Sequence, residues 1–383
     1  PLVFPDNDRP GILLADAART HLHRSGVAAG SRAVVFTATD SAYAAARDLK
    51  AAGVVVALVA DLRPTLSPAA AAARAAGIRV EPSTTIEATT GSTRVESVRL
   101  ARVAANGSVS PGETVACDVV LHCAGFTPTV HLFSQSRGKL RWDDARGVFL
   151  PGDAHEDNAC AGACNGAETL AACLDEGAAA GAAAALAAGC GEVPARRHAA
   201  DGLAIEIGGH FGEVPHGRDA STVKCFVDLQ HDVTAKDIRL ATREGFRSIE
   251  HVKRFTTTGM ATDQGKASNM NALAVAAASM GRDVPEVGLT SFRRPYTPVS
   301  FGAFAGVNRG DLFDPIRRTP AHTAAAARGA PFEDVGLWKR AWWFPREGED
   351  RHAAVARECR TVRTTVGVFD ASTLGKIEVV GPD

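Results

Sequence analysis

The stretch that decides the fold runs from residue 224 to residue 271 and reads KCFVDLQHDVTAKDIRLATREGFRSIEHVKRFTTTGMATDQGKASNMN. A first helix is predicted to begin at Thr234, because Asp237 follows it in a capping-box pattern. Val233 and Ile238 flank that start with the spacing of a hydrophobic staple. This part of the chain is therefore expected to begin a small helical domain.

A second helix is predicted to begin at Ser248, which has the side chain of an N-cap residue. Its apolar residues Ile249, Val252 and Phe255 are spaced to lie on one face. Gly259 stands where a left-handed C-cap is expected. Two short helices therefore lead into the polar loop that follows.

The loop over residues 262–269 reads TDQGKASN and opens a third helix over residues 270–280. It presents Lys266, the Ser268 hydroxyl and free backbone N–H groups at the start of that helix. A helix N-terminus beside a cation is a favourable site for an anion. The plainer interpretation is that Lys266 is a solvated loop lysine and that Asn269 only caps the helix.

This segment resembles the small helical domain of the alpha subunits of heterotetrameric sarcosine oxidases, and more distantly the [2Fe–2S] domain of bacterioferritin-associated ferredoxin type. The iron–sulfur relatives carry a Cys-x-Cys pair before the first helix and a Cys-x4-Cys pair in the loop. Here Val227 stands in place of the second partner of Cys225, while Asp263 and Ser268 occupy the loop positions. One thiolate cannot hold a cluster that needs four ligands, so the resemblance implies the helical scaffold without iron.

The composition excludes several classes of function. A formal net charge of −1 over 383 residues gives no indication of binding to nucleic acid or to an anionic membrane surface. No charge-free apolar run reaches about 18 residues, so no membrane-spanning helix is expected, and residues 177–189 are predicted to form a packed helix. Pro1 opens in mid-pattern, which indicates an internal piece of a longer polypeptide.

The eight cysteines contain no CxxC pair, which indicates reduced thiols in the cytoplasm rather than a disulfide framework. Cys160 and Cys164 have no His or Cys partners at ligand spacing, so no metal site is predicted.

The first half of the chain has the pattern of a nucleotide-binding fold. A β-α-β unit is predicted over residues 33–61, followed by a helix capped by Ser67, a hairpin turn at Asn106-Gly107 and a strand at residues 116–122. The first turn, residues 37–42, has none of the glycines that let a backbone approach a pyrophosphate. This unit is therefore expected to have the shape of a dinucleotide domain without binding one at its first turn.

A second, small-residue turn is the better candidate for a cofactor contact. Gly152-Asp153 follows a strand, and residues 161–169 read AGACNGAET before a helix predicted over residues 167–188. Small residues permit close approach, and the helix offers its N-terminus. The alternative is a loop that only allows tight helix–sheet packing. The candidate contacts are Asp153, Gly162, Ala163, Asn165, Gly166, Ala167 and Thr169.

Residues 4–11 and 123–128 look like the crossovers of flavoproteins with two nested dinucleotide-binding domains. With them, the resemblance to sarcosine oxidase alpha subunits covers essentially the whole chain. It implies an α/β, Rossmann-like FAD/NAD(P)-binding fold, present in part, whose first GxGxxG lies upstream of Pro1. It also implies bound NAD that takes no part in the turnover chemistry.

Residues 366–379, VGVFDASTLGKIEV, resemble the opening of the folate-binding aminomethyltransferase domain of glycine-cleavage T-protein type. Trp338, Trp342 and Trp343 are interpreted as core or interface residues rather than as a ligand site. The expected order is a partial nested dinucleotide-binding domain (1–190), a linker (191–222), the small all-α domain (223–282), an extended connecting arm (283–350) and the start of an α+β folate-binding domain (351–383).

The resemblance implies an oxidoreductase that acts on CH–NH donors with oxygen as acceptor. The whole enzyme would oxidise sarcosine on FAD in the beta subunit, pass electrons to FMN at the alpha–beta interface and form peroxide. The methylene group would pass to tetrahydrofolate or leave as formaldehyde, with gamma and delta subunits completing the complex. Gly265, Lys266, Ser268 and Asn269 are the candidates to face the FMN, and no residue of this chain is expected to be an acid–base catalyst.

Two other functions are compatible with the same residues. The chain could belong to the alpha subunit of a dye-linked amine or opine dehydrogenase that has lost its cluster, although the segment at 366–379 argues against this. It could also be a non-catalytic docking scaffold with a degraded nucleotide site.

Overall fold

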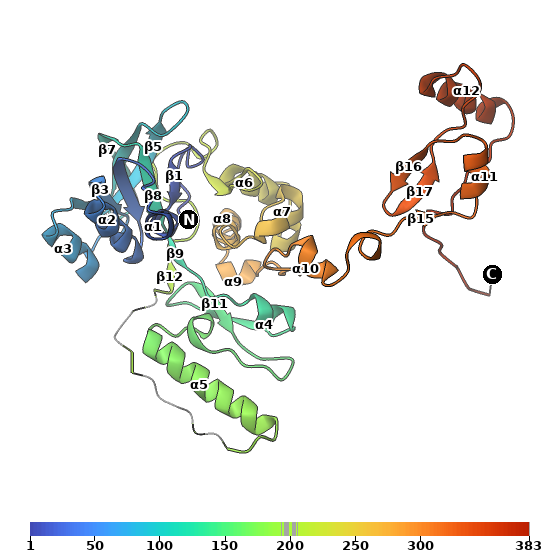
Figure 1. Ribbon diagram of the computed structural model, residues 1–383. Coiled ribbons are helices and arrows are strands. Elements are labelled where there is room, and N and C mark those ends of the chain that lie inside the picture. Colours follow the sequence, from blue (N-terminus) through green and yellow to red (C-terminus); the bar gives the residue numbers. More distant parts are fainter. Residues whose placement is uncertain (193, 195–198, 201–203, 205, 383) are drawn as a thin grey trace. The chain divides into compact units, whose positions relative to one another are not determined.

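The computed structural model describes residues 1–192, 194, 199–200, 204 and 206–382 (Figure 1). The chain forms two compact units, Pro1–Thr297 and Pro298–Asp383, and each is described by itself.

A parallel sheet forms the centre of the first unit. Its strands lie in the order β1-β8-β2-β3-β4. Their bounds are β1 Ile12–Leu14, β2 Arg32–Thr37, β3 Val55–Asp61, β4 Val80–Glu81 and β8 Val119–Cys123. The predicted strand at residues 116–122 is thus β8, displaced by a few residues. The order and the parallel register confirm the predicted Rossmann-like fold.

Successive residues of β2 serve two cores, because side chains alternate between the faces of a sheet. Ala33 and Val35 pack with helices α1 (Ala15–Ser25), α2 (Ser41–Ala51) and α3 (Pro68–Ala75). All three helices therefore cover one face. The other face packs against an antiparallel sheet of β5 (Thr84–Thr90), β6 (Ser97–Val103) and β7 (Val109–Ala116).

The local signals of this unit are largely confirmed. The Ser67 hydroxyl accepts a hydrogen bond of 3.2 Å from the Ala70 N–H and caps α3. The predicted hairpin joins β6 to β7, with Gly107 at φ +79°. In α2 the N-cap residue is Asp40, whose side chain bonds Arg63 instead of the helix backbone.

After β8 the chain forms a second, looser layer. Its elements are β9 (Gly125–Phe126), α4 (His131–Gln135), β10 (Leu140–Asp143), β11 (Val148–Pro151), the 3-10 turn η1 (Gly162–Asn165) and α5 (Leu170–Ala187). β12 (Gly208–Gly209) returns to pair with β9. The small-residue turn predicted before a helix is therefore η1 followed by α5, which begins three residues later than expected.

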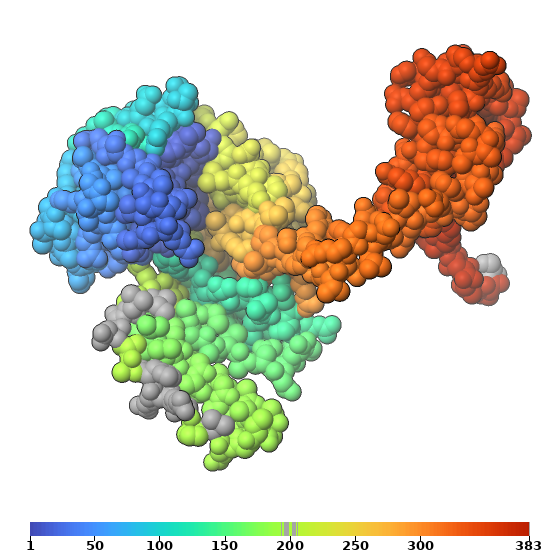
Figure 2. Space-filling view, in the orientation of Figure 1, coloured from blue at the N-terminus to red at the C-terminus, as the bar shows by residue number. Residues whose placement is uncertain are grey.

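Helix α5 departs from the expectation of a packed helix, because none of its residues is buried. Figure 2 shows this segment, in green, at the surface. In the part of the chain that the structure describes, η1 is its main neighbour. By length and composition α5 is also apolar enough to cross a membrane, with a mean hydropathy of 1.3, although it carries Asp175 and Glu176.

The small helical domain comprises β13 (Phe226–Asp228), β14 (Val233–Thr234), α6 (Ala235–Arg243), α7 (Ile249–Thr256), the 3-10 turn η2 (Ala261–Asp263), α8 (Asn269–Met280) and α9 (Val284–Val287). The capping box is confirmed: Thr234 N–H donates to Asp237 at 2.8 Å, and Asp237 N–H donates to the Thr234 hydroxyl at 3.3 Å. Val233 and Ile238 are both buried, as the staple requires.

Two details of α7 differ from the sequence pattern. Ile249 and Val252 are buried, but Phe255 is 47% exposed and packs beside Phe246. The helix ends at Thr256 and its C-cap is Thr257, which has φ +68° and lies two residues before the predicted Gly259. Gly259 is also left-handed, at φ +69°, and it belongs to the following loop.

The second unit contains more regular structure than the predicted arm over residues 283–350. Its elements are α10 (Phe301–Ala305), the 3-10 turn η3 (Gly310–Leu312), β15 (Arg317–Arg318), α11 (His322–Ala327), β16 (Phe332–Val335), β17 (Trp338–Ala341) and α12 (Arg351–Thr364). The strands form one sheet in the order β15-β17-β16. Among the described residues no strand forms at 366–379, because a strand needs a hydrogen-bonded neighbour and none is present there.

Candidate functional site

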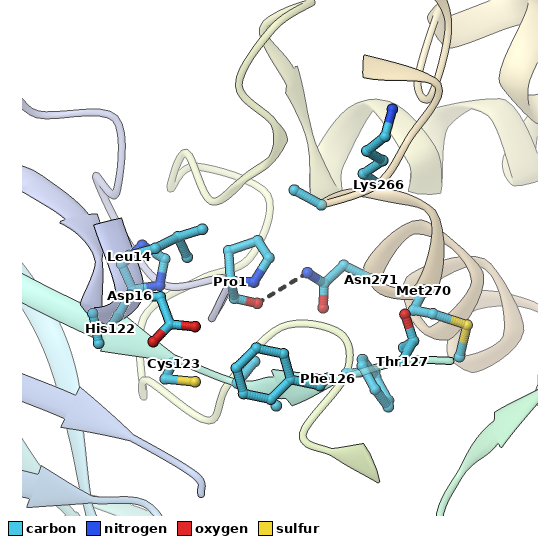
Figure 3. Close-up of a pocket in the computed structure, with 15 residues that line it drawn as sticks. Pro1, Leu14, Asp16, His122, Cys123, Phe126, Thr127, Lys266, Met270 and Asn271 are labelled. Atoms are coloured by element: carbon cyan, nitrogen blue, oxygen red, sulfur yellow. Dashed lines mark hydrogen bonds between the residues drawn. The ribbon is translucent and has the colours of Figure 1, made fainter. Parts of the chain in front are cut away.

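A cavity of about 320 Å³ lies at the carboxyl edge of the parallel sheet (Figure 3). Its walls come from residues 14–16 at the end of β1, residues 122–127 at the end of β8, and residues 266–267 and 270–271 at the start of α8. Phe211 and Pro1 complete the lining. Ligands of open α/β sheets bind at this edge, and the volume lies within the usual range of roughly 300–1,000 Å³ for small-molecule sites.

Lys266 lies at the rim of this cavity, and Figure 3 shows its ammonium directed away from the interior. Its Nζ donates hydrogen bonds to the carbonyl of Tyr296 at 2.7 Å and to that of Asp263 at 3.2 Å. The same ammonium lies 4.1 Å from the centre of the Tyr296 ring, which in turn stacks on His131 with ring centres 3.6 Å apart. Carbonyls and a ring orient the charge without neutralising it, so a positive charge is held in place beside the cavity.

The start of α8 adds hydrogen-bond donors to the same wall. Met270 and Asn271 line the cavity, and in the described part of the chain their backbone N–H groups have no protein acceptor. The Asn271 side chain is already used: it donates to the Pro1 carbonyl at 3.0 Å (Figure 3) and accepts from the Gly212 N–H, also at 3.0 Å. The amide therefore fixes the wall, while the helix N–H groups remain for a ligand.

The four loop residues predicted to face a flavin have separate positions. Only Lys266 lines the cavity. Ser268 and Asn269 are buried, and their side chains bond Asp228 and the Gln264 carbonyl. Gly265 has φ +71°, and a Cβ there would lie 2.0 Å from Asn269 Oδ1, so this glycine is required by the loop itself.

The opposite wall carries an acid and a neutral histidine. Asp16 is exposed in the first turn of α1 and lines the cavity. The Nδ1 atom of His122 accepts a hydrogen bond of 3.0 Å from the Leu2 N–H, and burial lowers the pKa of His122 to about 3. The cavity therefore has Lys266 and Asp16 as its charged side chains among the residues that line it.

The residues predicted to contact a dinucleotide lie apart from this cavity, around η1. The Gly162 N–H donates to the Glu176 carboxylate at 2.9 Å, and Asn165 Nδ2 donates to it at 3.2 Å. Gly166 has φ +96°, and a Cβ there would lie 3.2 Å from Leu150. The turn is thus closed tightly against β11.

The remaining predicted contacts flank that turn. Ala163 is half-buried and Ala167 buried. The Thr169 hydroxyl accepts from the Ala172 N–H at 3.1 Å and caps α5. Asp153 is exposed, and its carbonyl accepts from the Lys139 N–H at 2.9 Å.

The first turn of the β-α-β unit is filled by the protein itself. The carboxylate of Glu206 accepts hydrogen bonds from the N–H groups of Asp40 at 2.8 Å and Ser41 at 2.9 Å. Asp61, at the end of β3, is bonded by Tyr43 and Arg63. The sequence alone showed that this turn lacks glycines. It did not show that Glu206 occupies the turn, because Glu206 comes from a distant segment of the chain.

One further cluster, Glu213, His216 and Cys225, has the composition of a metal site. The Nδ1 atom of His216 accepts from the Arg218 N–H at 3.1 Å, so in the neutral ring Nε2 carries the hydrogen and donates to Glu213 at 2.9 Å. Arg239 bonds the other carboxylate oxygen. A metal would have to displace these donors, so the cluster is a buried hydrogen-bond network.

The pKa values of Glu213 and Cys225 are set by burial and by the hydrogen bonds within this network. Burial alone raises the pKa of Glu213, but hydrogen bonds from His216, Cys225 and Arg239 outweigh it and hold that pKa at about 2. Burial, and then the bond to Glu213, raises the pKa of the Cys225 thiol. All eight cysteines are free thiols in the structure.

The chain matches two family models. Residues 222–307 match the sarcosine oxidase A3 domain, and residues 321–383 match the GCVT N-terminal domain. The first match covers the helical domain and the loop with Lys266. The second begins before the predicted folate-binding segment and includes β16, β17 and α12.

Curated relatives match over the whole chain. It is 46% identical over 388 residues to the sarcosine oxidase subunit alpha of Corynebacterium sp. strain P-1, covering 100% of this chain and 40% of that protein. It is 40% identical to the sarcosine oxidase subunit alpha of Rhizobium meliloti strain 1021, covering 38% of that protein. The chain therefore spans about two fifths of the length of these relatives.

Among solved structures, L-proline dehydrogenase from P. horikoshii shares the fold. The TM-score is 0.55 at 21% sequence identity, and the match covers 79% of this chain and 55% of that one. The fold, the two domain matches and the full-length similarity agree, and the chain belongs to the family of sarcosine oxidase alpha subunits.

Proposed function

We propose that the complete subunit containing this chain takes part in the oxidative demethylation of sarcosine, and that this part of it provides one side of a flavin site and holds a dinucleotide. In that reaction sarcosine loses two electrons and two protons, and dioxygen takes them up as hydrogen peroxide. The observation that carries the flavin proposal is an apolar-walled cavity that has the ammonium of Lys266 fixed at its rim.

The cavity fits the carbonyl-bearing edge of a flavin ring better than a flavin phosphate. Phe126 and Phe211 offer flat apolar walls, the N–H groups of Met270 and Asn271 offer donors on one side, and Lys266 adds a positive charge at the rim. A phosphate dianion would need more donors than this wall provides and would meet Asp16 opposite. FMN bound here would supply the one- and two-electron chemistry, and this chain would orient it and set the charge beside it.

For the dinucleotide we propose the turn at residues 162–169, with Asp153 beside it, and NAD as the ligand. The small side chains and the left-handed glycines allow close approach of a cofactor. Glu176 already accepts from Gly162 and Asn165, so we assign this turn to close packing against the dinucleotide rather than to a pyrophosphate bond at Gly162.

The proposal also covers what packs against α5 in the complete subunit, where the complex is located, and which other subunits and cofactors it contains. The exposed face of α5 is covered there by the remaining part of the dinucleotide-binding domain rather than by lipid, because Glu176 on this helix binds η1. The complex is cytoplasmic, includes beta, gamma and delta subunits, and carries FAD and tetrahydrofolate outside this chain. The match to the GCVT N-terminal domain supports the folate proposal.

The flavin proposal is tested by expressing the full parent subunit with its partner subunits and quantifying the cofactors released on denaturation. Lys266→Ala should lose FMN and keep FAD and NAD, whereas Lys236→Ala, which removes an exposed lysine from α6, should keep all three. Unchanged FMN in Lys266→Ala would remove Lys266 from the flavin site.

The dinucleotide proposal uses the same preparation. Ala163→Glu should lose NAD and keep FMN, because it adds bulk and negative charge at the turn, whereas Ala71→Glu on the exposed side of α3 should keep both. If no NAD is released from the wild type, the assignment of residues 153–169 fails. Peroxide formation with sarcosine, measured beside reduction of an artificial dye, distinguishes an oxidase from a dehydrogenase.

A further inference from the structure

We propose that the carboxylate of Asp228 is the group that positions Lys266, by closing the loop over residues 259–268 from both ends. The inference rests on the proposed role of Lys266 at the flavin. Asp228 itself does not line the cavity, so it acts through the loop and is a positioning residue.

The carboxylate of Asp228 is buried, with 3% of the residue exposed, and it accepts four hydrogen bonds. One oxygen accepts from the N–H groups of Gln230 at 3.0 Å and His231 at 3.2 Å. The other accepts from the Gly259 N–H at 2.7 Å and the Ser268 hydroxyl at 3.2 Å. Gly259 begins the loop and Ser268 ends it, so one side chain ties both ends to β13.

These donors carry no formal charge. In the described part of the chain Asp228 forms no ion pair with a lysine, arginine or histidine. A buried carboxylate that relies on neutral dipoles needs all of them in place, because an unsatisfied buried charge is costly. The closed loop is therefore the arrangement in which the charge of Asp228 is best stabilised, and opening the loop would remove two of its four donors.

A second set of contacts continues from β13 to the lysine. The Gln230 side chain donates to the Thr262 hydroxyl at 2.6 Å and accepts from the Asp263 N–H at 3.0 Å. The carbonyl of Asp263 then accepts from Lys266 Nζ at 3.2 Å. The direction of the ammonium is thus set from Asp228 and Gln230 through the loop backbone.

Asp228→Asn is the most informative substitution because it preserves the shape. An amide presents an –NH₂ group on one side, which would face either two backbone N–H groups or the Gly259 N–H. The loop should open more often, and Lys266 should leave the carbonyl and ring of Tyr296 more often. Its amine should then react faster with an acylating reagent.

The experiment uses the full subunit with its partners. The rate of acetylation of Lys266 by acetic anhydride is measured by mass spectrometry, with the exposed Lys139 in the same sample as reference. We expect an increase of about tenfold in Asp228→Asn, the factor that corresponds to about 1.4 kcal/mol and to the loss of one buried hydrogen bond. Asp237→Asn is the matched control: it breaks the cap of α6 with the same charge change, and the Lys266 rate should stay unchanged.

The outcomes separate this inference from the flavin proposal. An unchanged Lys266 rate in Asp228→Asn overturns the positioning role, whatever the cofactor content. Retained FMN in Lys266→Ala overturns the flavin proposal, while a raised Lys266 rate in Asp228→Asn still supports the positioning role. If Asp228→Asn does not fold, Gln230→Ala removes only the second set of contacts, and it should raise the Lys266 rate by a smaller factor; no change there also overturns the inference.

Discussion

The carboxylate of Glu206 accepts a hydrogen bond of 2.9 Å from the backbone N–H of Ser41, the first residue of α2. In a dinucleotide domain of this topology, the N-terminus of this helix is where a pyrophosphate binds. Here the chain supplies its own anion to that position. The unit therefore keeps the sheet and helices of a nucleotide fold while its first turn serves to attach a segment of the same chain.

Removing this carboxylate should cost stability and leave the dinucleotide in place. Glu206→Ala is expected to lower the free energy of unfolding by about 1 kcal/mol, because the first N–H groups of α2 lose their acceptor. The loss should shrink as salt is added. Urea unfolding of the full subunit measures this, with the exposed Glu244→Ala as control. A fall in NAD content would mean that this contact also supports the dinucleotide site, and unchanged stability would mean that the carboxylate is dispensable for α2.

Gly265→Ala should be costly for two separable reasons. Its φ of +71° disfavours any side chain, and its Cβ would lie 2.0 Å from Asn269 Oδ1. Gly281 has a similar φ of +61°, and a Cβ there would meet no atom within 4 Å, so Gly281→Ala measures the backbone cost alone. The overlap at Gly265 should add roughly 1–3 kcal/mol to that cost in the free energy of unfolding. Equal losses for the two variants would show that Asn269 moves aside freely.

Glu213 should make stability depend on pH in the acid range. Its folded pKa of about 2 lies below the ordinary 4.5, so its contribution is fully present above pH 4.5 and is lost as pH falls toward 2. The shift corresponds to about 3 kcal/mol. Unfolding free energies of wild type and Glu213→Gln, measured from pH 7 to pH 3, should differ most at pH 7 and converge on acidification. A difference that does not vary with pH would assign the loss to packing instead.

The features that were predicted correctly from the sequence are those that depend on residues close together in the chain. The capping box at Thr234, the cap at Ser67 and the hairpin at Gly107 depend on contacts within a few residues, and the structure confirms all three. Lys266 was singled out from the same kind of local signal, since it lies in a loop before a helix, and its contact with a flavin stays a prediction. Each of these signals fixes where a helix or strand begins or ends, and the order of helices and strands is what indicated the fold class.

The rest depended on contacts between distant segments. Asn271 bonds Pro1 across 270 positions, and Glu206 bonds Ser41 across 165, so no local pattern reports them. The cavity wall at Asp16 was missed because an acidic residue in a first helical turn is ordinary. Helix α5 was expected to pack, but none of its residues is buried, and η1 is its main neighbour among the described residues.

The pKa of His131 provides a local measure of the Lys266 charge. Burial, and then the positive charge of Lys266, lowers the pKa of His131 below its ordinary value of 6.5. Both side chains contact the Tyr296 ring: the His131 ring stacks on it with centres 3.6 Å apart, and the Lys266 ammonium lies 4.1 Å from its centre. Lys266→Met should therefore raise the pKa of His131, because it removes the charge while burial by the stack remains.

An NMR titration of the His131 ring in the wild type, Lys266→Met and Lys236→Met measures this effect. The pKa should rise only in Lys266→Met, and added salt should reduce the difference between that variant and the wild type, as screening requires. A pKa that stays the same in Lys266→Met would mean that burial alone depresses it and that the ammonium lies farther from the ring stack. Since the same ammonium is proposed to face the flavin, that result would also weaken the assignment of the cavity.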